Sequence, residues 1–318
     1  MVNLPNLDKI TEKFIKEVSE KNGKPLYELS PKDARNFLSD LQKATHQELN
    51  ADILDVEIPT EEAGTVNVRF VKPQGNFETL PLIVYCHGGG WVMGDKDVFD
   101  MTIKTISIHT KSIVAFVEYS RSPEAKYPVA INQIYGVLKY LSVNGSSYNI
   151  DAKRIAIVGD SAGGNMAAAV ALMAKKNNDI NLCFQALIYP VTDADMSSES
   201  YNDFENGPWL SKKAMEWFWD EYLTDKKDKD DMCVSPLKTD IKDLQGLPPA
   251  LVIVAENDIL RDEGEEYARK LIAAGVDTAC VRINNTCHDF LMLNALRESK
   301  ATKAAYKLLC KFLKHALH

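Results

Sequence analysis

The sequence has little of what secreted, membrane and metal-binding proteins use. Its 318 residues contain only six cysteines, and no two of them have Cys-x-x-Cys spacing. Scattered cysteines in a chain this long indicate reduced thiols and argue against a disulfide framework or a zinc site. The longest apolar run, Met166 to Ala174, is far too short to span a membrane. The first residues include no apolar segment typical of a signal peptide, so we expect a cytoplasmic protein.

Basic residues are in the minority, because 37 lysines and arginines stand against 45 aspartates and glutamates, for a formal net charge of −8. A nucleic-acid-binding protein would need a clustered basic surface, so no nucleic-acid partner is expected. Neutral small molecules are slightly favoured over anionic ones. Hydrophobic residues make up 45% of the chain, which predicts an ordinary globular protein with a sizeable core.

From about residue 52 onward, apolar β-rich runs alternate with helical patterns. The runs stand at 53–58, 65–71, 81–86, 113–118, 155–158, 182–188, 250–255 and 278–283. This alternation predicts crossover connections and a mostly parallel sheet. Several runs are apolar on both faces, which predicts helices on each side of the sheet. The predicted fold class is therefore α/β.

Two segments stand outside this alternation. Residues 1–50 carry two amphipathic helical patterns, at 7–22 and 31–45, before the first predicted strand. Residues 193–235 separate two core strands and are polar and acidic, apart from one aromatic helical stretch. We expect both segments to form a cap over the binding pocket of a catalytic domain that spans 51–318.

A Gly-x-Ser-x-Gly motif lies between a predicted strand and a predicted helix, in the sequence Gly159-Asp160-Ser161-Ala162-Gly163. A nucleophile elbow turns so sharply there that its serine is strained and its neighbours must be small. The helix N-terminus also favours developing negative charge. The motif therefore predicts Ser161 as a nucleophile. A structural tight turn is the alternative, and a phosphate-binding loop is disfavoured because no Gly-Lys-Ser/Thr follows.

Three consecutive glycines follow the predicted strand 81–86, in the sequence His87-Gly88-Gly89-Gly90-Trp91. Such a segment can point its backbone N–H groups into a cavity, so it is predicted to form an oxyanion hole with the N–H of Ala162. A flexible glycine turn is one alternative. A dinucleotide-binding loop is disfavoured by the glycine spacing. His87 is expected to be structural, whereas Gly88 and Trp91 are expected to contact the substrate.

The acid and the base are expected after the last two strands. In serine hydrolases with such an elbow, the acid and then the histidine follow the serine in sequence. Asp258 stands just after the strand 250–255, and His288 stands in the loop after the strand 278–283. Because the carboxyl ends of parallel strands meet at one edge of the sheet, both should lie beside Ser161. Nearby acids that are expected to cap or solvate the next helix instead are Glu256, Asp262 and Glu263.

Together these motifs resemble those of the hormone-sensitive-lipase-like esterases of the α/β-hydrolase superfamily. Further matching stretches are Ser235-Pro236-Leu237, Leu247-Pro248-Pro249-Ala250, Asp258 to Gly264 and His288-Asp289-Phe290. The resemblance covers the chain from about residue 55 to its end. It implies an α/β-hydrolase fold with a helical cap, a homodimer as a common assembly, and ester hydrolysis without a metal or an organic cofactor. It places the oxyanion donors at Gly89, Gly90 and Ala162.

The predicted function is hydrolysis of short- to medium-chain carboxylic esters through an acyl-enzyme. His288 would take the proton of Ser161 and return it to the leaving alkoxide, while Asp258 orients the imidazole. The expected partner is a small-molecule ester, with no nucleic acid, membrane, metal or cofactor. Two alternatives stay open: an amidase or deacetylase with the same triad, and a non-catalytic small-molecule receptor on the same scaffold.

Overall fold

One eight-stranded sheet forms the centre of the protein. The computed structural model describes residues 6–21, 23–76 and 78–318, and within them the strands lie in the order β1-β2-β4-β3-β5-β6-β7-β8. Their bounds are β1 Ala51–Thr60, β2 Gly64–Pro73, β3 Leu80–Cys86, β4 Ile113–Glu118, β5 Ile150–Asp160, β6 Phe184–Ile188, β7 Ala250–Asn257 and β8 Thr278–Cys287. Each run predicted from the sequence is a strand, and the predicted α/β class is confirmed.

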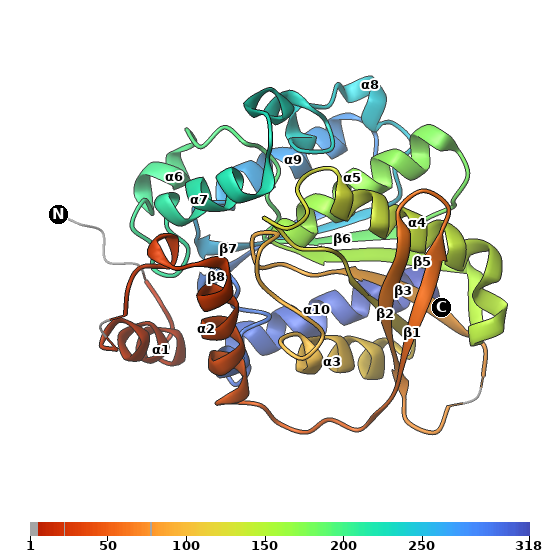
Figure 1. Cartoon of the computed structure of the whole chain (residues 1–318), viewed down its shortest axis with the longest axis horizontal. Helices are drawn as coiled ribbons and strands as arrows, with labels where there is room; N and C mark the ends of the chain where they lie inside the picture. The colour runs from red at the N-terminus through yellow and green to blue at the C-terminus, as the bar shows by residue number, and fades with distance from the viewer. Residues whose placement is uncertain (1–5, 22, 77) are drawn as a thin grey trace.

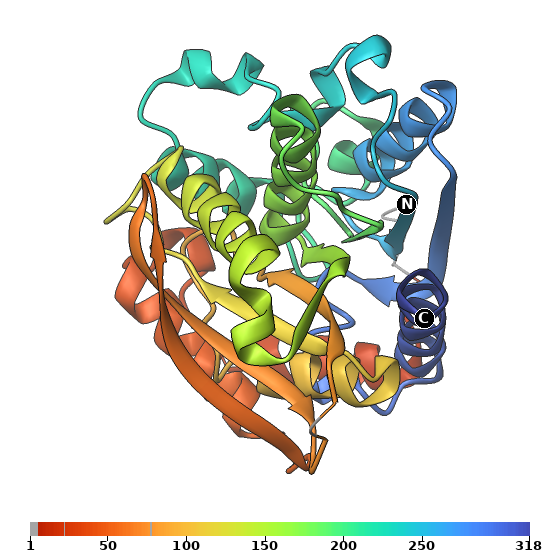
Figure 2. The ribbon, with the colours of Figure 1, turned by 90° about the vertical axis from the view of Figure 1, so that its right-hand side faces the viewer.

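The sheet is mostly parallel. Strands β3 to β8 pair in parallel, whereas β1 and β2 form an antiparallel hairpin whose second strand also runs antiparallel to β4. Figure 2 shows this long hairpin at one edge of the molecule. Every residue of the central strand β3 is buried, while the edge strand β8 alternates between half-buried and exposed positions until its last two residues, which are buried. Helices on both faces of the sheet explain why β3 is buried along its whole length.

Helices cover the two faces of the sheet. Figure 1 shows α4, α5 and α9 on one face and α3 and α10 on the other. The bounds of these helices are α3 Asp100–Thr110, α4 Val129–Asn144, α5 Ala162–Asn177, α9 Arg261–Ala273 and α10 Lys300–Leu317. Within the described residues, no helix is both long enough and apolar enough to cross a membrane.

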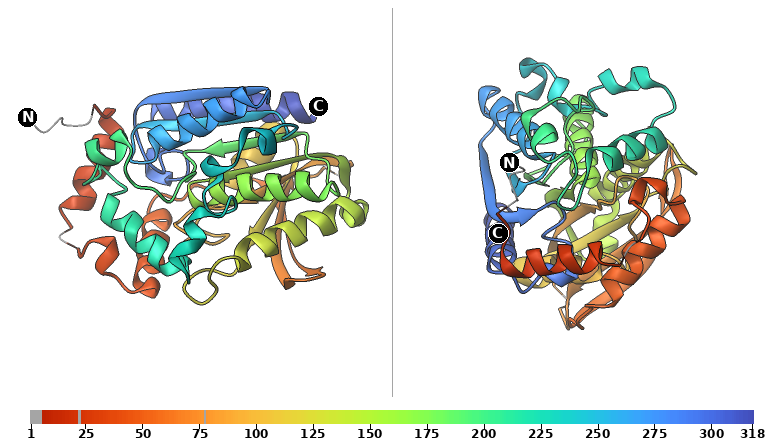
Figure 3. Two further views of the ribbon diagram at one scale, coloured as in Figure 1. Left: turned by 90° about the horizontal axis from the view of Figure 1, so that it is seen from above. Right: turned by 90° about the vertical axis from the view of Figure 1, so that its left-hand side faces the viewer.

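Most of the remaining helices gather at the end of the sheet where the parallel strands finish, whereas the last of them, α8, lies away from that end, beside α9 (Figures 1 and 3). They come from the N-terminal segment and from the segment between β6 and β7. Their bounds are α1 Lys9–Ser19, η1 Leu26–Glu28, α2 Pro31–Lys43, α6 Glu199–Asp203, α7 Lys212–Tyr222, η3 Lys226–Asp230, η4 Pro236–Lys238 and α8 Ile241–Leu244. Two short 3₁₀ turns lie elsewhere, at η2 Gly145–Tyr148 and η5 Asn294–Leu296.

Each N-terminal helix begins directly after a capping side chain; α2 begins at the predicted residue 31, whereas α1 begins two residues later than predicted. Asp8 accepts hydrogen bonds from the backbone N–H groups of Ile10 and Thr11, and Ser30 accepts one from Asp33. Both helices end two or three residues before the predicted limits, which is within the usual fraying of helix ends. Residues 1–5 and 22 of the predicted N-terminal segment lie outside the described residues.

Candidate active site

Ser161 occupies the tight turn between β5 and α5. Its backbone angles, φ 55° and ψ −122°, are rare for a residue with a side chain and are typical of a strained elbow. The flanking glycines are sterically required, because a Cβ on Gly159 would overlap the main chain of Gly163. A Cβ on Gly163 would in turn overlap the main chain of Cys86. The backbone N–H of Ser161 donates to the carbonyl of Ile188, which fixes the turn on β6.

His288 and Asp258 lie beside this serine. The imidazole Nε2 is 2.8 Å from the hydroxyl of Ser161, and Nδ1 is 2.7 Å from a carboxylate oxygen of Asp258. The other carboxylate oxygen of Asp258 accepts the backbone N–H of Leu260 at 3.0 Å. All three residues are buried, and the most accessible of them, Ser161, exposes 6% of its surface. The structure thus brings together the three residues that the sequence predicted as a triad, from the ends of three parallel strands.

The alternative acids have other partners. Glu256 accepts the backbone N–H of Asn285 at 2.7 Å, and Asp262 accepts that of Ser200 at 2.7 Å. The buried carboxylate of Glu263 accepts the backbone N–H of Thr192 at 2.6 Å. Each of these carboxylates therefore binds the backbone of another segment, and none forms the hydrogen bond that Asp258 makes to the histidine.

His87, the earlier histidine candidate, belongs to the core. Its ring stacks on Tyr119 at 4.1 Å and on Phe116 at 5.0 Å, and Nδ1 lies 2.8 Å from the carbonyl of Gly88. Burial lowers the pKa of His87 to about 3, only partly offset by the hydrogen bond to Gly88. An imidazole that stays neutral and lies within an aromatic stack serves packing, as the sequence predicted.

Two glycines of the loop after β3, Gly89 and Gly90, line the same cavity as Ser161. Their φ angles of 97° and 61° lie in the region that favours glycine. No hydrogen bond from either N–H to another described residue is present. Ala162 is the first residue of α5, where an N–H has no carbonyl of its own helix to reach. All three groups can therefore donate to an oxyanion.

Gly88 and Trp91 do not reach the cavity, so their predicted contact with substrate needs correction. The N–H of Gly88 donates instead to the buried carboxylate of Asp160 at 3.0 Å. Trp91 is fully buried and stacks on Tyr222 of α7 at 4.3 Å, with the rings 5° from parallel. Its φ of 61° lies in the left-handed region. Both residues therefore stabilise the glycine loop on the side away from the cavity.

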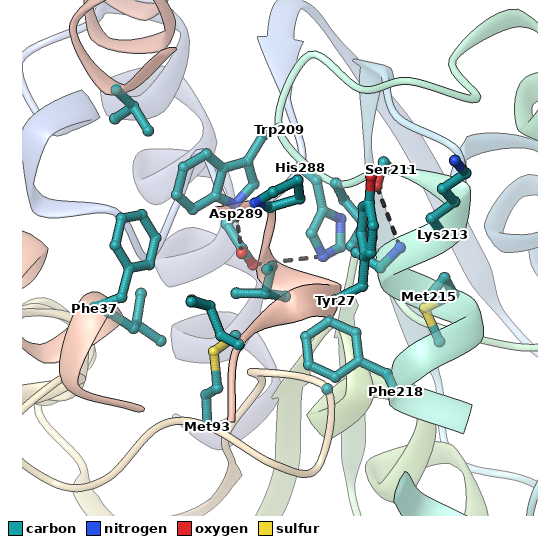
Figure 4. Close-up of a pocket in the computed structure, with 18 of the residues that line it drawn as sticks. Tyr27, Phe37, Met93, Trp209, Ser211, Lys213, Met215, Phe218, His288 and Asp289 are labelled. Carbon is teal, nitrogen blue, oxygen red and sulfur yellow. Dashed lines mark hydrogen bonds and ion pairs between the residues drawn. The ribbon is translucent and has the colours of Figure 1, made fainter. Parts of the chain in front are cut away.

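A cavity of about 420 Å³ opens above the serine, between the sheet and the helices of segments 1–50 and 193–235 (Figure 4). The N-terminal segment supplies one wall and the loop and helix of α7 supply the other. The wall is mainly apolar, and its larger apolar side chains include Ile15, Leu26, Phe37, Met93, Trp209, Met215 and Phe218. An apolar cavity of this size fits the acyl and alkyl parts of a small ester.

Three carboxylates set the charge state of His288. Burial favours its neutral form, but Asp258, Asp289 and Asp160 outweigh burial and raise the pKa of His288 above its usual 6.5. In the sequence, Asp289 belongs to the stretch His288-Asp289-Phe290 that resembles the family, and no role was predicted for it. Its carboxylate lies 3.5 Å from Nε2 of His288 and lines the cavity. An acid directly after the predicted base was the available signal for it.

Helix α2 is anchored to both loops of the site, which sequence reasoning missed. The guanidinium of Arg35 donates to the carbonyls of Val92 and Ser122, each at 2.8 Å, and pairs with Glu124. The amide of Gln42 donates to the carbonyl of Met292 at 3.0 Å, in the loop that follows His288. Neither residue belongs to a recognisable motif, so their long-range partners had no signal in the sequence.

Comparisons with known proteins agree with this architecture. Residues 83–292 match a family model described as the alpha/beta hydrolase fold. Carboxylesterase NlhH of Mycobacterium tuberculosis is 35% identical over 254 residues, which are 80% of this chain and 79% of NlhH. An esterase of Gibberella moniliformis is 32% identical over 310 residues, or 95% of each chain. The crystal structure of a thermostable esterase from Pseudomonas putida matches with a TM-score of 0.97 at 40% identity, over 99% of both chains.

The fold and these similarities define a class, the carboxylic-ester hydrolases built on the α/β-hydrolase fold. Within that class, the chain belongs to the hormone-sensitive-lipase-like esterases and is a serine carboxylesterase. The family and the enzyme class predicted from the sequence motifs are both confirmed.

Proposed function

We propose that the protein hydrolyses short- to medium-chain carboxylic esters through a Ser161–His288–Asp258 triad and an acyl-enzyme. The observation that carries the proposal is the continuous hydrogen-bond chain from the serine hydroxyl to the buried carboxylate, at 2.8 Å and 2.7 Å. A histidine held between a hydroxyl and a carboxylate has the geometry of a general base with a fixed tautomer.

In the proposed reaction, His288 takes the proton of Ser161 as the hydroxyl oxygen attacks the ester carbonyl. The N–H groups of Gly89, Gly90 and Ala162 stabilise the oxyanion of the tetrahedral intermediate. The imidazolium then protonates the leaving alkoxide, which departs as the alcohol and leaves the acyl group on the serine. Water repeats the sequence on the acyl-enzyme, releases the carboxylic acid and restores the serine.

We also propose that residues 1–50 and 193–235 act as a cap on a catalytic domain that spans the rest of 51–318. Both segments contribute apolar side chains to the cavity wall above Ser161, among them Phe37 from the first and Phe218 from the second. Such a wall shields the acyl chain from bulk water and limits the length of chain that fits. A cytoplasmic location, a homodimer and the absence of nucleic-acid partners stay predictions.

The test of the catalytic assignment uses Ser161→Ala and two matched acid variants, with 4-nitrophenyl acetate as the substrate. Ser161→Ala should keep the fold and lose several orders of magnitude in turnover, as loss of a covalent nucleophile does. Asp258→Asn should lower kcat by roughly 10³- to 10⁴-fold by disfavouring the required tautomer. Glu256→Gln, whose carboxylate contacts Asn285 and not the histidine, should do much less. A tenth of wild-type activity in Ser161→Ala, or the reverse ranking of the acids, would overturn the assignment.

A further inference from the structure

Asp289 occupies an unusual place beside the catalytic histidine. One of its carboxylate oxygens lies 3.5 Å from Nε2 of His288, the same nitrogen that is 2.8 Å from the hydroxyl of Ser161. The backbone of Asp289 has a φ of 63°, in the left-handed region, and its carbonyl accepts the N–H groups of Met292 and Leu293 at 3.0 Å. The side chain is therefore held on a tight turn and directed into the cavity (Figure 4).

This carboxylate competes with the serine for one proton. When Nε2 carries a proton, an anionic oxygen is a stronger acceptor than a hydroxyl, since charge-assisted hydrogen bonds are roughly twice as strong as neutral ones. At 3.5 Å the carboxylate attracts the imidazolium without forming a close hydrogen bond. A small rotation toward Nε2 would pair the two and draw the imidazole away from Ser161.

The indole of Trp209 holds the other oxygen of the same carboxylate. Its Nε1–H donates to Asp289 at 2.9 Å, from the loop between α6 and α7 (Figure 4). The indole ring is itself held by the N-terminal helices, because it packs on Phe14 of α1 at 5.3 Å and on Phe37 of α2 at 6.5 Å. Segments from three distant parts of the chain thus determine where the Asp289 carboxylate points.

We propose that Asp289 is a positioning residue whose carboxylate is kept off His288 by the Trp209 N–H, so that the closed cap leaves Nε2 paired with Ser161. When the indole withdraws, the freed carboxylate pairs with the protonated Nε2 and holds the histidine as an imidazolium that cannot act as a base. The contact therefore makes the basicity of His288 depend on cap closure. This inference rests on the role of His288 as the general base proposed above.

The other groups around the imidazole stand at the ends of sheet strands and not on the cap segments. Asp258 follows β7, Asp160 ends β5, and the ring of Tyr189, which follows β6, meets the imidazole edge-on at 4.9 Å. Cys287, at the end of β8, is buried, and burial raises the pKa of its thiol. Four charged residues of the cap segments line the same cavity: Lys21, Lys24, Glu205 and Lys213. In the described part of the chain, none of them forms an ion pair with His288 or Asp289.

The test measures the pKa of His288 in the full-length protein by NMR of selectively labelled histidine, with the signal assigned by its loss in His288→Gln. Asp289→Asn keeps an acceptor for the indole but removes the charge, so it should lower this pKa by roughly 1 unit, as loss of a charge at this range does. Trp209→Phe keeps the ring but removes the donor, so it should raise the pKa. In the Asp289→Asn background, Trp209→Phe should have no effect.

The pH profile of kcat/KM for 4-nitrophenyl acetate gives a second readout, whose acidic limb should move with the NMR value in each variant. Trp217→Phe is the matched control, since this tryptophan lies on α7 and packs on Phe218 without contacting Asp289. Equal shifts in Trp217→Phe and Trp209→Phe would overturn the proposal, as would an undiminished effect of Trp209→Phe in the double variant or an unchanged pKa in Asp289→Asn. Because the NMR titration requires no turnover, it distinguishes these failures from a failure of the proposed triad, which Ser161→Ala reports.

Discussion

Replacing Arg35 with methionine should show that helix α2 is part of the active-site framework. The guanidinium reaches three partners: the carbonyl of Val92, the carbonyl of Ser122 and the carboxylate of Glu124. Val92 and Ser122 are buried, whereas the Glu124 side chain is 64% exposed. Methionine keeps the length and the apolar stem of arginine but supplies no donor, so both carbonyls lose their partner.

The magnitude follows from the difference in burial. A hydrogen bond from a charged group contributes roughly 1.5–3 kcal/mol, whereas an exposed ion pair contributes about 0–1 kcal/mol. Methionine and arginine lose similar side-chain entropy when they are ordered, so that term nearly cancels, and the loss of two such bonds in Arg35→Met should destabilise the fold by about 3–6 kcal/mol. For a chain of this size that corresponds to a decrease in Tm of roughly 5–9 °C. Glu124→Gln should change Tm by less than about 2 °C, because only the exposed pair is weakened.

Thermal unfolding of the two variants, followed by kcat/KM for acetyl through decanoyl 4-nitrophenyl esters, gives the assay. The N–H of Val92 donates to the carbonyl of Gly89 at 3.2 Å, so a loosened Val92 should disturb the oxyanion loop itself. Arg35→Met should therefore lower kcat for all chain lengths to a similar degree. If Glu124→Gln proves as damaging to Tm as Arg35→Met, the surface ion pair carries the link and the argument from buried carbonyls is refuted.

Three further predictions concern the site. Gly90→Ala should lower kcat by about 10²- to 10³-fold, because the new Cβ would overlap the ring of Phe218 and displace an oxyanion donor. The control is Gly246→Ala, which has a similar φ but no neighbouring atoms near the new Cβ and should leave kcat unchanged. Phe37→Ala should raise kcat/KM for decanoyl relative to acetyl esters by enlarging the apolar wall, and an unchanged chain-length profile would contradict the proposed cap. The base must be neutral and the pKa of His288 is raised, so kcat/KM should increase with pH through a midpoint above 6.5, and a flat profile from pH 6 to 9 would exclude a histidine base.

The residues that sequence reasoning located correctly are those governed by local rules and by sheet topology. Ser161 stands between a strand and a helix, in a turn that only small neighbours permit. Asp258 and His288 follow parallel strands, and the carboxyl ends of such strands share one edge. Neither inference required knowledge of side-chain packing, and the structure brings all three residues within hydrogen-bond distance.

The orientation of the Trp91 side chain could not be predicted from local rules and sheet topology. Its position after three glycines predicts the loop but not the direction of its ring, which depends on a positive φ and on a partner in α7, Tyr222. The stacking partner is more than a hundred positions away in the sequence, so no local pattern links the two. The same limit applies to Trp209 and Asp289, whose hydrogen bond joins the cap to the turn after His288.

The N-terminal helices could be read from the sequence in two ways, as a cap over the pocket or as a brace for the core. In the structure, Phe37 and Leu38 of α2 line the cavity, while Arg35 and Gln42 on the same helix bind the glycine loop and the loop after His288. The amphipathic pattern predicts an apolar face but cannot say which side chains at its border find buried carbonyls. Deleting the segment would remove wall and brace together and lower activity on every ester. Only point variants, Phe37→Ala for the wall and Arg35→Met for the brace, separate the two roles, because one should change the acyl-chain profile and the other the stability.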